Sequence, residues 1–214
     1  PIIVYVHGGY WQALSKADSF FGANHFAARG IAYAALDYTL APAASLTQIV
    51  AECHAALETL ARNAGWLGID PQRVFLAGSS AGAHLSAMCC SSPPASLQPS
   101  GAILLSGIYE LEPFVSISDN DAVGLSIEQA RANSPLLLST DHYVDTIISW
   151  GEHETAEFKR QSLAMAHRLH GAKKPVRAFE SLGRNHFDVV HEMANPDSLL
   201  GQQVEKMLNQ SRRS

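Results

Sequence analysis

The chain has 214 residues, a formal net charge of −5, 47% hydrophobic residues and 16% charged residues. This length supports one sizeable core, and the high share of hydrophobic residues with few charged ones suits a parallel sheet covered on both faces. The negative charge offers no basic field for nucleic acid or a membrane, and no apolar run reaches the ~20 residues of a membrane span. We therefore expect a small-molecule substrate, no nucleic acid and no membrane, with a homodimer left open.

The cysteines and the amino end of the chain indicate the cellular compartment. Three cysteines, two of them adjacent at Cys89 and Cys90, do not make a disulfide framework and fit a reducing cytoplasm. The amino end shows no signal-peptide pattern, so we expect a cytoplasmic protein. The chain opens inside an apolar run at Pro1. We expect further residues before Pro1 in the complete protein, because an uncovered sheet edge invites association.

The first predicted strand, residues 2–6, is a continuous apolar run suited to burial on both faces. His7-Gly8-Gly9-Tyr10-Trp11 follows it directly. A glycine pair lets the backbone approach a substrate, and backbone N–H groups aimed at a carbonyl oxygen stabilise the negative charge that acyl transfer develops there. We predict an oxyanion loop in which Gly9 and Tyr10 donate, Gly8 shapes the turn and His7 braces it. The alternative is a plain turn after a strand.

The next elements alternate as β-α-β units do: a strand at 31–36, a helix at 46–63 and a strand at 74–77. Gly78-Ser79-Ser80-Ala81-Gly82 then joins the last strand to a small-residue helix at 81–90. Such a G-x-S-x-G turn strains the serine and presents its Oγ above a sheet. We predict Ser80 as a nucleophile and the N–H of Ala81 as the third oxyanion donor.

A strand at 101–105 precedes a long stretch without clear periodicity, residues 109–140, and long loops of this kind are usually functional. The strand at 147–150 is followed by two candidate acids, Glu152 and Glu154. Serine hydrolases with such a G-x-S-x-G turn carry nucleophile, acid and base in that chain order, which fits both residues. We favour Glu154, which stands three residues after the strand-ending Gly151, where the acid commonly sits, and keep Glu152 as the competitor. Two further acids are less suitable, since Asp145 precedes the strand and Asp188 lies too near the predicted base.

The base is predicted from position among ten histidines. A helix at 155–170 and a strand at 174–179 lead to His186, which lies past the carboxyl end of a strand, where open α/β sheets collect their active sites. His167 and His170 are three residues apart on the helix but lack a third ligand, so we expect no metal and no cofactor. We expect Ser211–Ser214 to be a frayed tail.

Several motifs together resemble one family, the α/β-hydrolase kynurenine formamidases (arylformamidases), near the hormone-sensitive-lipase-like esterases. They are His7–Trp11, Asp37–Pro42, Ser80–Leu85, Leu105–Leu111, Ser134-Pro135, Glu157–Ser162 and Asn185–Phe187. The resemblance implies one α/β-hydrolase domain over residues 1–214, a mostly parallel sheet with helices on both faces, a cap at about 109–140, and missing N-terminal strands. The family's acid is often aspartate, whereas glutamate stands here.

The resemblance also implies a reaction, the hydrolysis of N-formylkynurenine to kynurenine and formate by Ser80, Glu154 and His186. Tyr10 and Trp11 would stack on the aromatic ring of the substrate, or else pack beneath the cap. Two alternatives stay open: a general carboxylesterase acting on short-acyl esters, and a non-catalytic relative that only binds.

Overall fold

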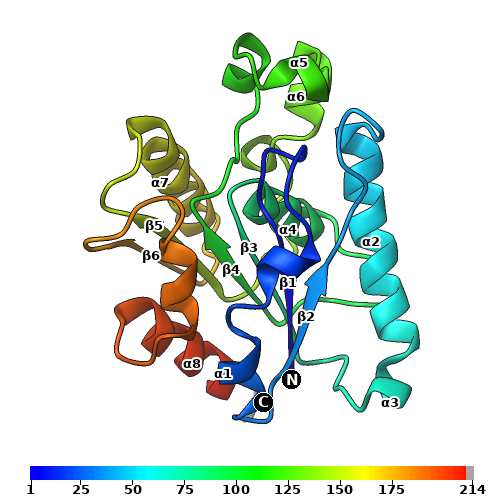
Figure 1. Cartoon of the computed structure of the whole chain (residues 1–214), viewed down its shortest axis with the longest axis vertical. Coiled ribbons are helices and arrows are strands. Elements are labelled where there is room, and N and C mark those ends of the chain that lie inside the picture. Colours follow the sequence, from blue (N-terminus) through cyan, green and yellow to red (C-terminus); the bar gives the residue numbers. More distant parts are fainter. Residues whose placement is uncertain (211–214) are drawn as a thin grey trace.

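The computed structural model describes residues 1–210, so the predicted tail at Ser211–Ser214 lies outside the described residues. Its centre is a six-stranded sheet in the order β2-β1-β3-β4-β5-β6, in which every neighbouring pair is parallel (Figure 1). The strands are β1 (Ile2–Val6), β2 (Ala32–Leu36), β3 (Val74–Ser79), β4 (Gly101–Leu105), β5 (Thr146–Gly151) and β6 (Val176–Ser181). The α/β-hydrolase class predicted from the sequence is confirmed.

Helices cover both faces of this sheet (Figure 1). The α-helices are α1 (Ala23–Ala27), α2 (Leu46–Arg62), α3 (Ala64–Leu67), α4 (Ala81–Ser91), α5 (Asn120–Val123), α6 (Ile127–Ala132), α7 (Ala156–Gly171) and α8 (Leu199–Gln210). The 3-10 helices are η1 (Lys16–Ser19), η2 (Pro113–Ser116), η3 (Pro135–Leu137) and η4 (Val189–Ala194). Within residues 1–210, none of the helices has both the length and the apolar character that crossing a bilayer requires.

The core divides into two clusters because successive side chains of a strand point to opposite faces. Val4 of β1 joins the larger cluster, which packs against α2, α4 and α7. Its neighbour Ile3 joins the smaller cluster, which packs against α1 and α8. Burial on both faces explains why β1, β3, β4 and β5 are fully buried along their length. The parallel arrangement brings the carboxyl ends of all six strands to one edge, where the candidate site lies.

The predicted element boundaries differ from the observed ones mainly near the carboxyl end of the chain. The last strand begins at Val176 rather than at residue 174, after a turn in which Lys173 adopts a φ of 58°. The segment after His186 enters a 3-10 helix, η4, before the long helix α8. Residues 109–140 contain four short helices, η2, α5, α6 and η3, and α5 and α6 project beyond the carboxyl ends of the strands (Figure 1).

Candidate active site

Ser80 occupies the turn between β3 and α4 with a φ of 55° and a ψ of −120°. A non-glycine residue rarely adopts a positive φ, and it does so where the surrounding structure enforces it. Here the Ser80 N–H donates to the carbonyl of Leu105 over 2.9 Å, and the Ser80 carbonyl accepts from the N–H of His84 over 3.1 Å. The turn is therefore fixed at both ends, and Ser80 lines a cavity at the carboxyl edge of the sheet.

The two glycines of this turn are required by close backbone packing. A Cβ at Gly78 would lie 2.4 Å from the backbone of Gly82, and a Cβ at Gly82 would lie 2.0 Å from the carbonyl oxygen of Val6. Both distances are shorter than any real Cβ contact. The glycines thus allow α4 to pack directly against β1 and β3.

His186 and Glu154 form a hydrogen-bonded pair in the same cavity. Nδ1 of His186 lies 3.0 Å from Oε2 of Glu154. Because an ionised carboxylate only accepts hydrogen bonds, Nδ1 carries the proton and Nε2 is left free to act as a base. The Glu154 side chain is 0% exposed, whereas that of His186 is 21% exposed. The acid is thus shielded from water while the imidazole reaches the cavity.

The Glu154 carboxylate is kept ionised by its partners. Burial by itself would raise its pKa, but hydrogen bonds from His186, from the Ser106 hydroxyl and from the N–H of Gly151 outweigh that effect and hold the pKa below its usual value. Oε1 accepts from both Ser106 Oγ and Gly151 N, the latter over 2.7 Å. Glu154 is therefore a fixed negative charge beside the imidazole.

The other acids considered from the sequence are engaged elsewhere. Oε2 of Glu152 accepts from the N–H of Gly183 over 2.7 Å. Asp145 pairs with Arg177 at the opposite end of β5, and Asp188 accepts from the N–H of Asn185 over 2.6 Å. Of the two glutamates left open by the sequence, the fold brings Glu154 to His186.

The predicted oxyanion loop has an unusual backbone. Gly9, Tyr10 and Trp11 have φ values of 95°, 48° and 61°, three consecutive residues in the left-handed region. Gly8 approaches the nucleophile turn so closely that a Cβ there would lie 3.0 Å from the carbonyl oxygen of Ser79. Among residues 1–210, the N–H groups of Gly9 and Tyr10 donate to no acceptor within the protein. These donors, like the N–H of Ala81 at the first position of α4, suit an external oxyanion.

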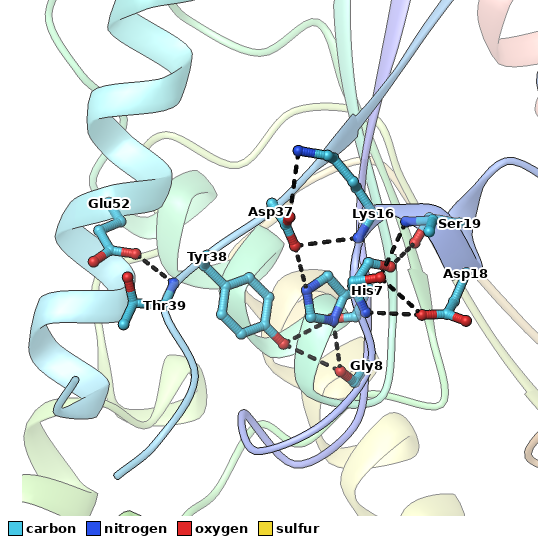
Figure 2. Close-up of polar contacts among 11 residues, drawn as sticks. His7, Gly8, Lys16, Asp18, Ser19, Asp37, Tyr38, Thr39 and Glu52 are labelled. Carbon is cyan, nitrogen blue, oxygen red and sulfur yellow. Dashed lines mark hydrogen bonds and ion pairs between the residues drawn. The ribbon is translucent and has the colours of Figure 1, made fainter. Parts of the chain in front are cut away.

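Polar contacts brace this loop from behind, as Figure 2 shows. The Tyr38 hydroxyl lies 3.1 Å from the carbonyl oxygens of both His7 and Gly8, and Nδ1 of His7 lies 2.9 Å from the Gly8 oxygen. The rings of His7 and Tyr38 stack with their centroids 4.1 Å apart, and Oδ1 of Asp37 lies 3.5 Å from Nε2 of His7. Because the C=O and N–H of a trans peptide point in opposite directions, holding the Gly8 carbonyl orients the N–H of Gly9.

The cavity containing Ser80, Glu154 and His186 has a volume of about 720 Å³. Tyr10, Thr155 and Phe158 line it and also line a smaller cavity of about 250 Å³ beside η2. The Phe158 ring lies 4.2 Å from that of His186, centroid to centroid. Tyr10 and Phe158 therefore form part of the cavity wall, and Phe158 is a lining residue to which no role was assigned from the sequence.

Trp11 is not in either cavity. Its side chain is fully buried, and its indole packs edge-to-face against Phe114 and His84. The expectation that Trp11 stacks on a substrate is therefore corrected in favour of the packing alternative. Trp11 lies in a loop without helical or strand periodicity, so the sequence does not indicate which way its side chain points. That direction depends on the segment that packs over the loop.

Comparisons with known proteins assign the chain to a family. The family model described as BD-FAE matches residues 1–98. Kynurenine formamidase of Salmo salar is 30% identical over 222 residues, covering 99% of this chain and 74% of that protein, and its counterpart in Danio rerio is 30% identical with the same coverage. The chain belongs to the kynurenine formamidase family. Like these relatives it is a hydrolase of the α/β-hydrolase type.

Solved structures of esterases share the fold of this chain. Carboxyl esterase 2 from Tuber melanosporum superposes with a TM-score of 0.79 at 20% identity, covering 100% of this chain and 78% of that one. At this identity the likeness concerns the fold. Within the described part of the chain, no three histidine, cysteine, aspartate or glutamate side chains gather as metal ligands would.

Two contributors to the site lie within motifs that carry the family resemblance, but no role was assigned to them from the sequence. Ser106 follows the carboxyl end of β4 with a φ of 48° and donates to Glu154. Tyr38 follows β2 and holds the oxyanion loop. The rule that selected His186, a polar residue just past the end of a parallel strand, could have found both of them.

Proposed function

We propose that this chain hydrolyses N-formylkynurenine and related arylformamides, with Ser80 as nucleophile, His186 as base and Glu154 as acid. The observation that carries the proposal is the Glu154–His186 pair in the same cavity as Ser80, in a chain 30% identical to kynurenine formamidases. The substrate is a small molecule, since the site is a concave cavity of about 720 Å³ rather than an extended surface. Gly9, Tyr10 and Ala81 supply the oxyanion donors.

In the acylation step, Oγ of Ser80 attacks the formyl carbon while Nε2 of His186 takes the hydroxyl proton. The carbonyl oxygen becomes an oxyanion that accepts from the N–H groups of Gly9, Tyr10 and Ala81. The C–N bond then breaks, and the proton passes from His186 to the leaving arylamine. Throughout, the Glu154 carboxylate stabilises the imidazolium and keeps the Nδ1 proton in place.

In the deacylation step, water attacks the formyl ester of Ser80 and gives one proton to Nε2 of His186. The tetrahedral intermediate collapses, the Ser80 oxygen recovers the proton from His186, and formic acid leaves and releases its proton to the solvent as formate. The same donors hold the second oxyanion. The cycle consumes one water and returns every side chain to its starting protonation state.

The test is a comparison of kcat/KM for N-formylkynurenine and for p-nitrophenyl acetate and butyrate, with the Ser80→Ala variant as the background. The proposal expects the formamide to be preferred. Equal or better turnover of the esters, abolished in the variant, would contradict it and favour the second candidate, a general carboxylesterase. The predominantly apolar wall, with Phe158, Phe187 and Val190 among its residues, is the observation that supports this second candidate.

We further propose a cytoplasmic location. Cys53, Cys89 and Cys90 are buried and free, which suits a reducing compartment. Subcellular fractionation of the native protein would test this proposal, and recovery from an oxidising compartment would contradict it.

A further inference from the structure

The side chain of Trp11 makes a polar contact in the interior of the protein. Its Nε1–H donates to Nδ1 of His84 over 3.3 Å, and both side chains are fully buried. Nε2 of His84 in turn lies 2.8 Å from the carbonyl oxygen of Asn133. Since Nδ1 accepts and a carbonyl oxygen can only accept, His84 is the neutral tautomer with its proton on Nε2. Burial lowers the pKa of His84 to about 4, which keeps this tautomer neutral.

This chain of hydrogen bonds joins three segments that are distant in sequence. Trp11 ends the oxyanion loop, His84 lies one helical turn after Ser80 in α4, and Asn133 follows α6. The indole also packs edge-to-face on Phe114 of η2, with ring centroids 5.3 Å apart. The loop is therefore attached both to the helix that carries the nucleophile and to the segment above it.

The loop needs such an attachment because its own backbone is strained. Tyr10 and Trp11 hold positive φ values that non-glycine residues rarely adopt, and such conformations persist only where the surroundings impose them. On one side, Tyr38 and His7 hold the Gly8 carbonyl. On the other side, the Trp11 carbonyl accepts from Ala41 N–H over 2.8 Å, and its side chain reaches α4 through His84.

We propose that the bond from Trp11 to His84 sets the spacing of the oxyanion hole, which makes both of them positioning residues. The hole has two halves, with Gly9 and Tyr10 on the loop and Ala81 at the start of α4. The Trp11–His84 bond connects these halves directly from behind, where no substrate reaches. The proposal rests on the function proposed above, since it assigns the hole to catalysis.

Three variants separate this bond from packing. Trp11→Phe keeps an aromatic ring but removes the N–H donor. In His84→Asn, Oδ1 takes the place of Nδ1 and can still accept from Trp11, whereas His84→Gln places its amide near Nε2 and loses that acceptor. With p-nitrophenyl acetate we expect Trp11→Phe and His84→Gln to lower kcat by about 10- to 100-fold with KM little changed, because small displacements of positioned groups are costly. His84→Asn should stay within about threefold of the wild type, and the Trp11→Phe/His84→Gln double variant should lose no more than either single variant.

A second readout isolates the oxyanion. A trifluoromethyl ketone that adds to Ser80 places an oxyanion in the hole, so its affinity should fall in proportion to kcat/KM in Trp11→Phe and His84→Gln. Phe26→Leu is the matched control, because it truncates a fully buried aromatic residue in the other core cluster. It should lower thermal stability while leaving kcat and inhibitor affinity unchanged.

Unchanged kcat in Trp11→Phe, or equal losses in His84→Asn and His84→Gln, would overturn the proposal. So would a loss of kcat without a loss of inhibitor affinity. Failure of the proposed function has a different signature: Ser80→Ala would retain ester hydrolysis, or N-formylkynurenine would not be cleaved. The ester assay and the inhibitor do not depend on the identity of the natural leaving group.

Discussion

Both carboxylate oxygens of Glu154 accept hydrogen bonds, one from His186 and one from the hydroxyl of Ser106. Oε1 accepts from Ser106 Oγ, just past the end of β4, and Oε2 accepts from His186. The two partners lie 48 and 32 residues away in the sequence. A carboxylate held at both oxygens cannot rotate away from the imidazole, so the orientation of His186 is set by the sheet itself.

This geometry predicts that Glu154→Gln lowers kcat far more than Glu152→Gln. Losing the negative charge leaves the imidazolium unsupported and changes the tautomer, which costs about 10⁴-fold in the best-studied triad. We expect a loss of at least 10³-fold for Glu154→Gln and less than threefold for Glu152→Gln, measured by steady-state kinetics. A large loss of kcat in Glu152→Gln would show that Glu152, and not Glu154, is the acid.

Ser80→Ala should abolish hydrolysis and leave the fold intact. Knocking out one triad member costs on the order of 10⁶ in kcat in a well-studied serine protease, and the removed hydroxyl faces a cavity rather than the core. Circular dichroism would check the fold, and a fluorophosphonate label would check the nucleophile by mass spectrometry. Labelling of the variant, or retention of more than a tenth of the activity, would show that another residue attacks.

Tyr38→Phe removes only the hydroxyl that holds the Gly8 carbonyl. The Gly9 N–H is then less firmly oriented, and we expect kcat to fall about tenfold while KM stays within twofold. Tyr143→Phe is a comparison variant, because its buried hydroxyl bonds to Ala87 and Ser91, outside the site. Equal kcat values for the two variants would contradict a role for Tyr38 in orienting the loop.

Stability should fall as the pH is lowered from about 6.5 to about 4. His84 has a pKa of about 4 in the folded protein because it is buried, while an unfolded histidine titrates near 6.5. In this window the unfolded state binds more protons than the folded state. The free energy of unfolding therefore falls with the pH, by about 3 kcal/mol in total below pH 4. Because the pKa of Glu154 is lowered in the folded protein, stability falls further at pH values below the ordinary pKa of a glutamate.

Urea unfolding at pH 7, 6, 5 and 4 would measure this slope. His84→Asn should reduce this slope, since the buried histidine with the lowered pKa is gone. A slope that is the same in the wild type and in His84→Asn would mean that other groups cause the acid sensitivity.

Gly82→Ala should destabilise the protein by about 2–3 kcal/mol, because the added methyl group meets the Val6 carbonyl at 2.0 Å. Gly65→Ala is the matched control in a short helix, where nothing lies within 4 Å of the added Cβ. It should be neutral or stabilising by up to about 1 kcal/mol. Thermal unfolding of both variants gives the comparison, and similar midpoints would contradict the close packing of α4 on β1.

The sequence by itself determined the sheet and the sites at its carboxyl edge. Apolar runs at 2–6, 74–77 and 101–105 predict buried parallel strands, and the residues just after them become the candidate loops, because strand direction alone brings those ends together. The strained serine turn could also be predicted from the sequence, because short-range steric contacts require its glycines.

Only the tertiary structure decided which side chains meet. Glu152 and Glu154 occupy one short loop, and their directions depend on Gly183 and Ser106, which pack against that loop from elsewhere in the chain. Trp11 is likewise adjacent to Tyr10, yet one is buried against His84 and the other lines the cavity. Sequence spacing fixes where a backbone segment lies, whereas the direction of a loop side chain is set by the distant segments packed around it.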